Sequence, residues 1–287
     1  MWLTRFAPAP TGYLHLGHVA NALHVWNEAR AHGGHVLLRI EDHDRERCRS
    51  DYESALLDDL DWLGFVPDLY PTSAFRNARG RMPCESRQSE RGGVYAAMAE
   101  RLRVQGLLYA CGCSRKTLQR AGVRAEGSSS DSAKHGSAAE VPYPGTCRNL
   151  SLPFEGEVGW RVTLPAMPVT FEDRWCGRRT QVPADQCGDL LIRERRGNWT
   201  YQFVATVDDY AQAVTNVIRG ADLLPSTGRQ ILLGGLLGRR QPATFAHHAL
   251  IMKSSNQKLS KSDGDTGLRD LRARGWTRDQ VLAATGG

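Results

Sequence analysis

The fold is decided by the stretch Arg5-Phe6-Ala7-Pro8-Ala9-Pro10-Thr11-Gly12-Tyr13-Leu14-His15-Leu16-Gly17-His18, near the start of the chain. Residues 4–9 have the character of a short strand, which the Pro/Gly turn at 8–12 ends. A helix is expected over Leu16–Ala31, and the apolar run at 35–40 predicts a buried strand. Strand, turn, helix and strand in this order are typical of the start of a parallel α/β sheet.

The rest of the chain falls into three parts. Helical spacing of apolar residues predicts helices at 51–63 and 91–105. The composition changes near Cys111, with a Ser-rich stretch near 122–140 and strand-like alternation at 160–164 and 169–171. From Asp189 buried α/β segments return, at 190–192, 202–207 and 214–218. We therefore predict a Rossmann-type α/β domain split over 1–110 and 189–240, an inserted unit at 111–188 with a mobile loop, and a C-terminal segment at 241–287.

Two histidines at the expected helix start suggest a phosphate site. His15 and His18 are three residues apart, so both can lie on the first turn and donate to phosphate oxygens at the positive helix end. Gly17 between them allows close approach of a nucleotide. The alternative is an ordinary pair of surface histidines. The glycine spacing does not match G-x-G-x-x-G, so a dinucleotide site gains no support.

A second motif, Lys258-Leu259-Ser260-Lys261-Ser262, lies near the C-terminus. Its two lysines are flexible point charges that could follow a phosphate during pyrophosphate departure. The alternative is a solvated basic loop.

Bulk composition sets wide limits on function. The 287 residues carry a net charge of +6 and 41% apolar residues, which permits a polyanionic partner such as RNA without requiring one. No apolar stretch is long enough to span a membrane, and the N-terminus has no signal-peptide core. Seven cysteines, an odd number, argue against a disulfide framework, so we expect a cytoplasmic protein.

Together the two motifs resemble the ATP-binding signatures of class I aminoacyl-tRNA synthetases. Two further segments, residues 39–44 (Arg-Ile-Glu-Asp-His-Asp) and 217–224 (Val-Ile-Arg-Gly-Ala-Asp-Leu-Leu), resemble glutamyl-tRNA synthetases. The resemblance implies that ATP and Mg²⁺ are bound, with His15, Gly17, His18 and Lys261 at the nucleotide and His15, His18, Lys258 and Lys261 in catalysis. It also implies a glutamate pocket formed by Arg5, Phe6, Ala7, Pro8, Ala9, Glu41, Tyr201 and Arg219.

Elementary chemistry agrees with the implied glutamate pocket. In it Arg5 and Arg219 would bind the side-chain carboxylate and Glu41 the α-amino group, since each charge is matched by its opposite. The alternative for either arginine alone is a structural ion pair. A glutamate carboxylate is already ionised at neutral pH, so its attack on the α-phosphate needs no general base and no Ser/His/Asp triad is expected.

The cysteine spacing suggests a metal site. Cys111-Gly-Cys113 and Cys147 could form three corners of a tetrahedral zinc site, and the alternative is buried free thiols. For the fourth ligand the residues alone favour His35, His135 or a water over a tyrosine. However, Cys-x-Cys with Tyr143-x₃-Cys147 resembles the glutamyl-queuosine tRNA(Asp) synthetases, which implies Tyr143 as the ligand. Cys48, Cys84, Cys176 and Cys187 lack such spacing.

The last resemblance implies a specific activity. Glutamate would be activated with ATP, without tRNA, and transferred to the queuosine base in the anticodon of tRNA(Asp). Because 25 residues follow Ser262 (287 − 262), we expect no anticodon-binding domain, and we expect a monomer. The alternatives are a truncated glutamyl-tRNA synthetase that charges a tRNA 3′ end, and a non-catalytic RNA-binding paralogue.

Overall fold

The computed structural model describes residues 1–77, 84–114, 117–118, 142–250, 252–254, 257–258 and 267–286. Its first elements are β1 (Leu3–Phe6), α1 (Leu16–Ala31) and β2 (His35–Leu38), with β1 and β2 parallel. The strand, turn, helix and strand predicted at the N-terminus are therefore confirmed. Helix α1 packs on both strands and buries its apolar side, including Val25, Trp26 and Ala29.

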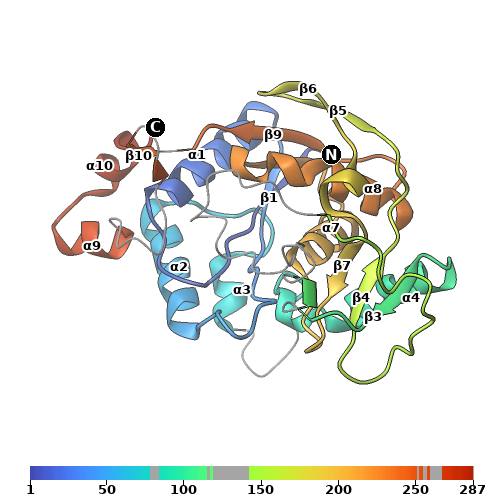
Figure 1. The fold of residues 1–287 in the computed structure, drawn as a ribbon. Coiled ribbons are helices and arrows are strands. Elements are labelled where there is room, and N and C mark those ends of the chain that lie inside the picture. The colour runs from blue at the N-terminus through green and yellow to red at the C-terminus, as the bar shows by residue number, and fades with distance from the viewer. Residues whose placement is uncertain are drawn as a thin grey trace.

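A mixed sheet lies beside this unit. It has the order β6 (Gly177–Gln181), β5 (Val169–Asp173), β9 (Thr244–His248) and β8 (Asn216–Gly220). Strands β8 and β5 run parallel to β9, whereas β6 is antiparallel to β5. Strand β8 lies next to β1, where the N–H of Thr215 donates to the carbonyl of Leu3 at 2.9 Å (Figure 1). The carboxyl ends of β1, β2 and β8 thus come together.

Helices and short turns complete the described chain. They are α2 (Ser50–Leu63), α3 (Thr72–Asn77), η1 (Gln88–Glu90), α4 (Gly92–Val104), α6 (Pro183–Cys187), α7 (Tyr201–Ala211), η2 (Ala221–Ser226), α8 (Thr227–Leu236), α9 (Leu268–Ala273) and α10 (Arg278–Ala283). The helices predicted at 51–63 and 91–105 are confirmed as α2 and α4. No helix among the described residues is both long and apolar enough to cross a membrane.

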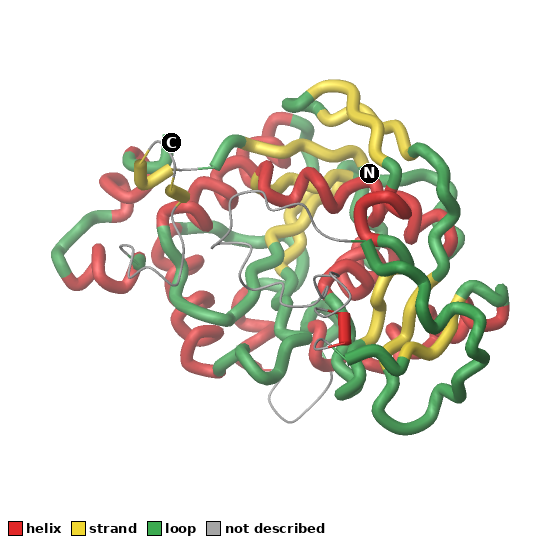
Figure 2. The backbone as a smooth tube through the Cα atoms, in the orientation of Figure 1, coloured by secondary structure: helices red, strands yellow, loops and turns green. Residues whose placement is uncertain are grey.

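A three-stranded antiparallel sheet forms a second group of strands (Figure 2). Its order is β3 (Leu108–Cys111), β4 (Gly159–Val162) and β7 (Leu190–Arg193). Strand β3 ends where the predicted insert (residues 111–188) begins, and β7 starts just after the insert ends. The sheet therefore brings the two ends of the insert together. The hairpin β5–β6, which falls within residues 111–188, instead pairs with β9 through Asp173 and Phe245. The domain boundaries at 111 and 189 stay a prediction.

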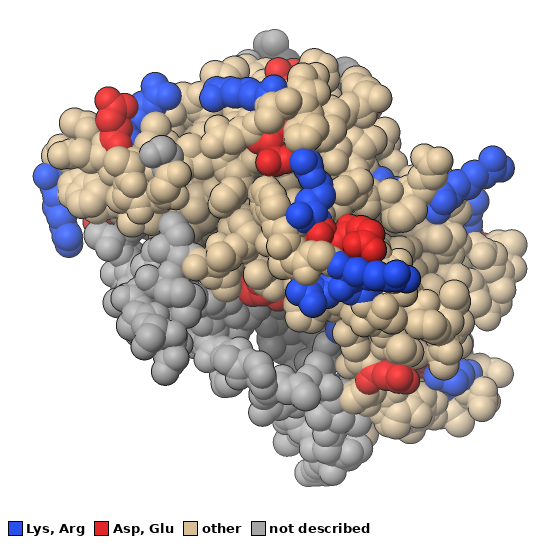
Figure 3. Space-filling model, turned by 90° about the horizontal axis from the view of Figure 1, so that it is seen from above, with Lys and Arg blue, Asp and Glu red and all other residues tan. Residues whose placement is uncertain are grey.

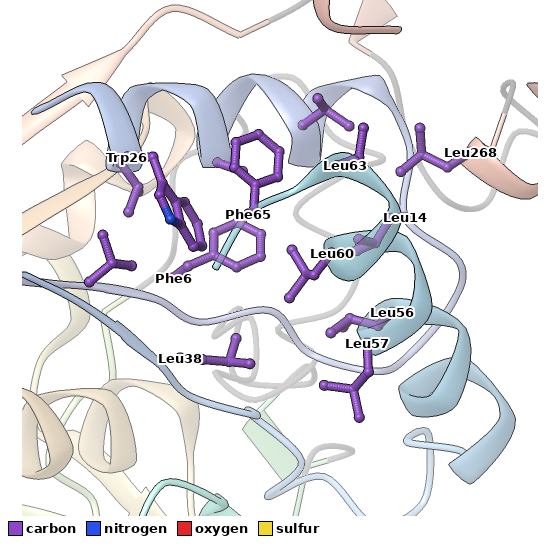
Figure 4. Close-up of a cluster of buried hydrophobic side chains, with 14 of the residues drawn as sticks. Phe6, Leu14, Trp26, Leu38, Leu56, Leu57, Leu60, Leu63, Phe65 and Leu268 are labelled. Carbon is purple, nitrogen blue, oxygen red and sulfur yellow. The ribbon is translucent and has the colours of Figure 1, made fainter. Parts of the chain in front are cut away.

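Two large hydrophobic cores hold these parts together. One lies under α1 and α2 and includes Phe6, Trp26 and Leu60 (Figure 4). Leu268 of α9 joins this core, and its N–H donates to the carbonyl of Leu14 at 2.8 Å. The other core lies between α4, α7, α8 and the three-stranded sheet, around Phe203. A last pair of strands is β10 (Met252–Ser254) with β11 (Gln257–Lys258).

Candidate active site

The first motif forms the N-terminal turn of α1. His15 is the N-cap residue, and its Nδ1 accepts the N–H of Gly17 at 3.0 Å. The Nδ1 of His18 accepts the N–H of His15 at 3.1 Å. Because each Nδ1 is an acceptor, the proton of each neutral ring lies on Nε2. Two N–H donors are therefore held at the positive end of a 16-residue helix, as phosphate binding requires.

Gly17 is needed for this arrangement. A Cβ at this position would lie 2.9 Å from the His15 ring. The sequence predicts that Gly17 allows close approach of a nucleotide. The structure shows that Gly17 also leaves space for the ring of the capping residue His15.

The second motif lies largely outside the described residues. Lys258 is in β11, but its side chain is not among the described parts, and Lys261 lies outside them. Gly267, six residues after Lys261, forms a bridge with His15. The chain that follows the second motif is thus anchored beside the first motif.

Arg5 and Arg39 share one buried carboxylate. Arg5 Nε donates to Asp209 Oδ1 at 3.2 Å, and an Nη of Arg39 donates to the same oxygen at 2.7 Å. All three side chains are at most 9% exposed. Although burial alone would raise it, the two guanidinium groups hold the pKa of Asp209 below its ordinary value. Asp209 thus fixes Arg5 at the carboxyl end of β1.

Glu41 lies next to this cluster, in a buried environment that disfavours its ionised form. Burial raises its pKa to about 7, despite Arg39 at 3.7 Å and the nearby charge of Arg5. Its backbone N–H donates to the carbonyl of Pro8 at 3.1 Å. A cation arriving at Glu41 would favour the ionised carboxylate, which suits recognition of an ammonium group.

Arg219 on β8 is held by neutral groups only. Its Nε donates to His247 Nε2 at 2.9 Å, and its Nη groups donate to Gln230 Oε1 at 2.7 Å and Thr227 Oγ1 at 3.0 Å. It is 4% exposed, and within the described part of the chain no carboxylate contacts it. Burial lowers the pKa of Arg219, although the residue stays a cation. Asp209 acts on this guanidinium only from a distance, so a buried cation with no carboxylate in contact among the described residues is a candidate binding site for an anion.

Tyr201, the first residue of α7, belongs to the same cluster of buried polar groups. Its phenol is close enough to interact electrostatically with Glu41, Arg5 and Arg219, and burial raises its pKa. Four predicted residues, Arg5, Glu41, Tyr201 and Arg219, are therefore brought together.

The other predicted pocket residues are placed less directly. The Phe6 side chain is in the hydrophobic core, 5.5 Å from the Trp26 ring, so it does not face a ligand. Pro8 is buried, whereas Ala7 and Ala9 are partly exposed. Any contact of residues 6–9 with a substrate would therefore come mainly from the backbone.

The sequence did not identify several residues that hold the pocket. They are Asp173, Asp209, Gln230 and His247. The one available signal was the acidic pair Asp208-Asp209 within an otherwise apolar helix. Asp208, completely buried, accepts from Gln88, Arg91 and Tyr95.

The predicted cysteines form a compact cluster. The sulfur atoms of Cys111, Cys113 and Cys147 lie within 4.8 Å of one another, with Cys113 and Cys147 3.6 Å apart. Two thiolates on one tetrahedral zinc ion lie about 3.8 Å apart, from Zn–S bonds of about 2.3 Å. The Tyr143 hydroxyl is 3.3 Å from the Cys111 sulfur and 3.7 Å from that of Cys113. The cluster can therefore hold a metal ion.

Tyr143 is the candidate fourth ligand that the described residues place at the cluster. The Arg161 guanidinium carbon lies 3.7 Å from the Tyr143 ring centroid, a cation–π contact that helps to fix the ring. His35 lies at the start of β2, near Asp68 at 3.8 Å, and is not part of the cluster. His135 is outside the described residues.

The whole chain matches one protein family. Residues 2–285 match the class I tRNA synthetases (E and Q), catalytic domain, and the chain belongs to this family. It is therefore a synthetase-type ligase with the α/β fold of that class.

Individual relatives show which kind of synthetase within this family the chain is similar to. The Glutamyl-Q tRNA(Asp) synthetase of Cupriavidus metallidurans is 42% identical over 265 residues, which are 91% of this chain and 77% of that protein. The protein of the same name from Ralstonia nicotianae is 39% identical over 286 residues, 98% of this chain and 81% of that protein. The resemblance predicted from the sequence is confirmed.

A solved structure shows the same fold. The glutamate tRNA ligase of Elizabethkingia meningosepticum, in complex with its amino acid, is 28% identical with a TM-score of 0.72. The match covers 96% of this chain and 53% of that ligase, so this chain spans about half of the ligase.

Proposed function

We propose that this chain activates glutamate with ATP, without tRNA, and transfers it to the queuosine base in the anticodon of tRNA(Asp). The names of the relatives support the acceptor. The choice of glutamate rests on one observation in the structure, the buried Arg219 that only neutral groups hold. An anionic side chain could form a direct ion pair with this guanidinium, and an uncharged amide could not.

Each step of activation has a candidate group. Arg219 and Arg5 would bind the substrate side-chain carboxylate, and Glu41 the α-ammonium. The α-carboxylate then attacks the α-phosphorus of ATP, and the bond to pyrophosphate breaks. The N–H groups of His15 and His18 would stabilise the phosphate charge, as would the ammonium groups of Lys258 and Lys261. ATP would arrive with Mg²⁺, which neutralises phosphate charge.

The transfer step consumes the adenylate. A queuosine hydroxyl attacks the activated carbonyl carbon, the bond to the phosphate oxygen breaks, and AMP leaves with the electron pair, while the hydroxyl proton passes to the departing phosphate or to water. Ground-state binding alone does not accelerate this step, so the pocket serves mainly to position the carbonyl.

We also propose that Cys111, Cys113, Tyr143 and Cys147 hold one structural zinc ion within the segment 111–188. The small hydrophobic cluster around these residues has few members, so metal ligation would supply the order that packing does not. Metal analysis of the purified protein should give about one zinc per chain, and a Cys113→Ser variant should retain less.

The first test is glutamate-dependent ATP–pyrophosphate exchange without tRNA. Exchange supports the proposal. Exchange that appears only after tRNA is added favours a glutamyl-tRNA synthetase, and no exchange under either condition favours a non-catalytic paralogue.

The acceptor is tested with two altered tRNAs. One is tRNA(Asp) that lacks queuosine, and the other carries queuosine but lacks the 3′-terminal adenosine. The proposal requires glutamate transfer to the second and none to the first. The reverse pattern would establish charging at the 3′ end. This alternative is tested because the fold is similar to that of solved glutamate tRNA ligases.

A further inference from the structure

Arg219 has an unusual set of partners for a buried cation. Three side chains fix its guanidinium, His247 at Nε and Gln230 and Thr227 at the two Nη groups. Each partner accepts a hydrogen bond, and none is a carboxylate. The group is thus held in place with no described carboxylate in direct contact, while Asp209 acts on it only from a distance.

His247 can accept from Arg219 only if its proton is on the other ring nitrogen. Its Nδ1 lies 2.5 Å from Asp173 Oδ2, and both side chains are 0% exposed. Asp173 is an acceptor here, because its other oxygen receives the backbone N–H groups of Trp175, Cys176 and His247. The proton therefore lies on Nδ1, and Nε2 presents its lone pair to Arg219.

We propose that His247 is a positioning residue for amino acid selection, oriented by Asp173 so that its neutral ring holds Arg219 without neutralising it. A carboxylate at this position would hold Arg219 equally well but would cancel its charge. The pocket would then lose its preference for an anionic side chain over an amide. The inference deepens the proposed glutamate specificity and rests on it.

Different replacements of His247 should have different effects. His247→Leu removes the acceptor and leaves Arg219 Nε unpaired. His247→Gln keeps a neutral acceptor that can also donate to Asp173. The matched control is His248→Leu, since His248 is the next residue of β9, is similarly buried, and hydrogen-bonds Asn21 and the carbonyl of Ala249 instead of Arg219.

The first experiment measures KM for glutamate and for glutamine in pyrophosphate exchange. His247→Leu should raise KM for glutamate about 10-fold or more and reduce the preference for glutamate over glutamine, with a smaller change in kcat. His247→Gln should restore most of the preference, and His248→Leu should leave it unchanged. An unaltered preference in a folded His247→Leu protein would overturn the inference.

A second measurement does not depend on activity. Nitrogen-15 NMR of the histidine rings should show His247 as the neutral Nδ1–H tautomer at pH 7, and Asp173→Asn should change that state. A charged ring or an Nε2–H tautomer in the native protein would refute the inference even if exchange occurs. Absence of glutamate-dependent exchange in the native protein with the expected tautomer would instead refute the proposed function.

Discussion

At the scale of single residues, the proposed glutamate site contains a buried carboxylate whose charge is costly to the fold. Glu41 is 7% exposed, and burial raises its pKa to about 7. An ammonium group would replace the lost hydration and return the carboxylate to its ionised form. If Glu41 binds the α-ammonium as proposed, substrate binding is linked to release of a proton from Glu41.

The first prediction is a pH-dependent affinity for glutamate. Because only ionised Glu41 can pair with an ammonium, KM for glutamate should rise about 10-fold from pH 8 to pH 6, on either side of the pKa of about 7. Pyrophosphate exchange across this range measures it. The Glu41→Gln variant should show a high KM that does not change with pH, and Glu46→Gln, an exposed neighbour, should behave as the native protein does. A flat native profile would contradict the assignment of Glu41.

The same substitution should stabilise the fold. The folded pKa of about 7 lies above the ordinary value of 4.5, so the folded state binds more protons between these two values. The contribution of Glu41 to stability is present below pH 4.5 and is lost as the pH rises through 7. Glu41→Gln should therefore raise Tm at pH 8 and have little effect at pH 5. The gain at pH 8 is up to about 3 kcal/mol.

The charged residues predicted for the glutamate site lie near one another in the structure, but the residues that support them were not predicted. Arg5, Glu41 and Arg219 lie in motifs that resemble known synthetase segments. Asp173 and His247 are 74 residues apart and become partners only because β5 and β9 pair. No periodicity or composition reports such a contact, since it depends on the tertiary pairing of strands.

At the scale of elements, Gly17 at the start of α1 leaves room for the capping ring of His15, which we propose also binds phosphate. Gly17→Ala places a Cβ 2.9 Å from the His15 ring, which must then leave its bond to the residue 17 N–H. The lost cap costs about 1 kcal/mol, and alanine in a helix returns about the same amount. We therefore expect an unchanged Tm with exchange kcat reduced about 10-fold or more.

The control for this prediction is Gly93→Ala in the first turn of α4. A Cβ at Gly93 has no atom within 4 Å. This variant should be as stable as the native protein or slightly more stable, with native exchange. If Gly17→Ala also exchanges within about twofold of the native rate, the His15 ring position is not needed for activation.

Gly188 provides the corresponding prediction for the cysteine cluster. Its φ is 68°, and a Cβ there would lie 2.1 Å from the carbonyl oxygen of Tyr143, with which it forms a bridge. Gly188→Ala should displace Tyr143 and lower the zinc content. Gly177→Ala, with φ of 71° and no atom within 4 Å of its Cβ, has the backbone strain without the clash and should keep its zinc. Equal zinc content in both variants would argue against Tyr143 as a ligand.

Element type was more predictable than element pairing. The helix at Leu16–Ala31 follows from its apolar spacing, and the structure has the same bounds. The alternation at 169–171 correctly indicated a strand, but it could not reveal that β5 joins β9 in the mixed sheet. Strand alternation records which face is buried and not which strand lies alongside.

At the scale of the whole molecule, the surface charge limits how RNA can bind. The net charge is +6, yet Figure 3 shows basic and acidic side chains interspersed over the face it displays.

A cavity beside the cysteine cluster is also lined by both acidic and basic side chains. Its charged lining consists of Glu46, Glu157, Arg161, Glu194, Arg195 and Arg196. Arg196 lies 3.3 Å from Glu46, and Arg195 lies 3.5 Å from Glu157. Arginines paired in this way have less charge to offer to phosphates.

The last prediction follows from the contrast between this mixed surface and the buried pocket. Phosphate contacts release counterions, so KM for tRNA should rise with salt with a log–log slope near the number of contacts, which we expect to be about 2 to 4. KM for glutamate should change less than about twofold over the same range, because Arg219 and Glu41 are screened little by salt. Transfer and exchange measured from about 50 to 200 mM salt give both values. A slope near 10 would require a continuous basic surface, in contrast to the interspersed charges that the described residues show in Figure 3. Equal salt dependence of the two KM values would mean that glutamate binds at an exposed site, which would contradict the pocket built around Arg219.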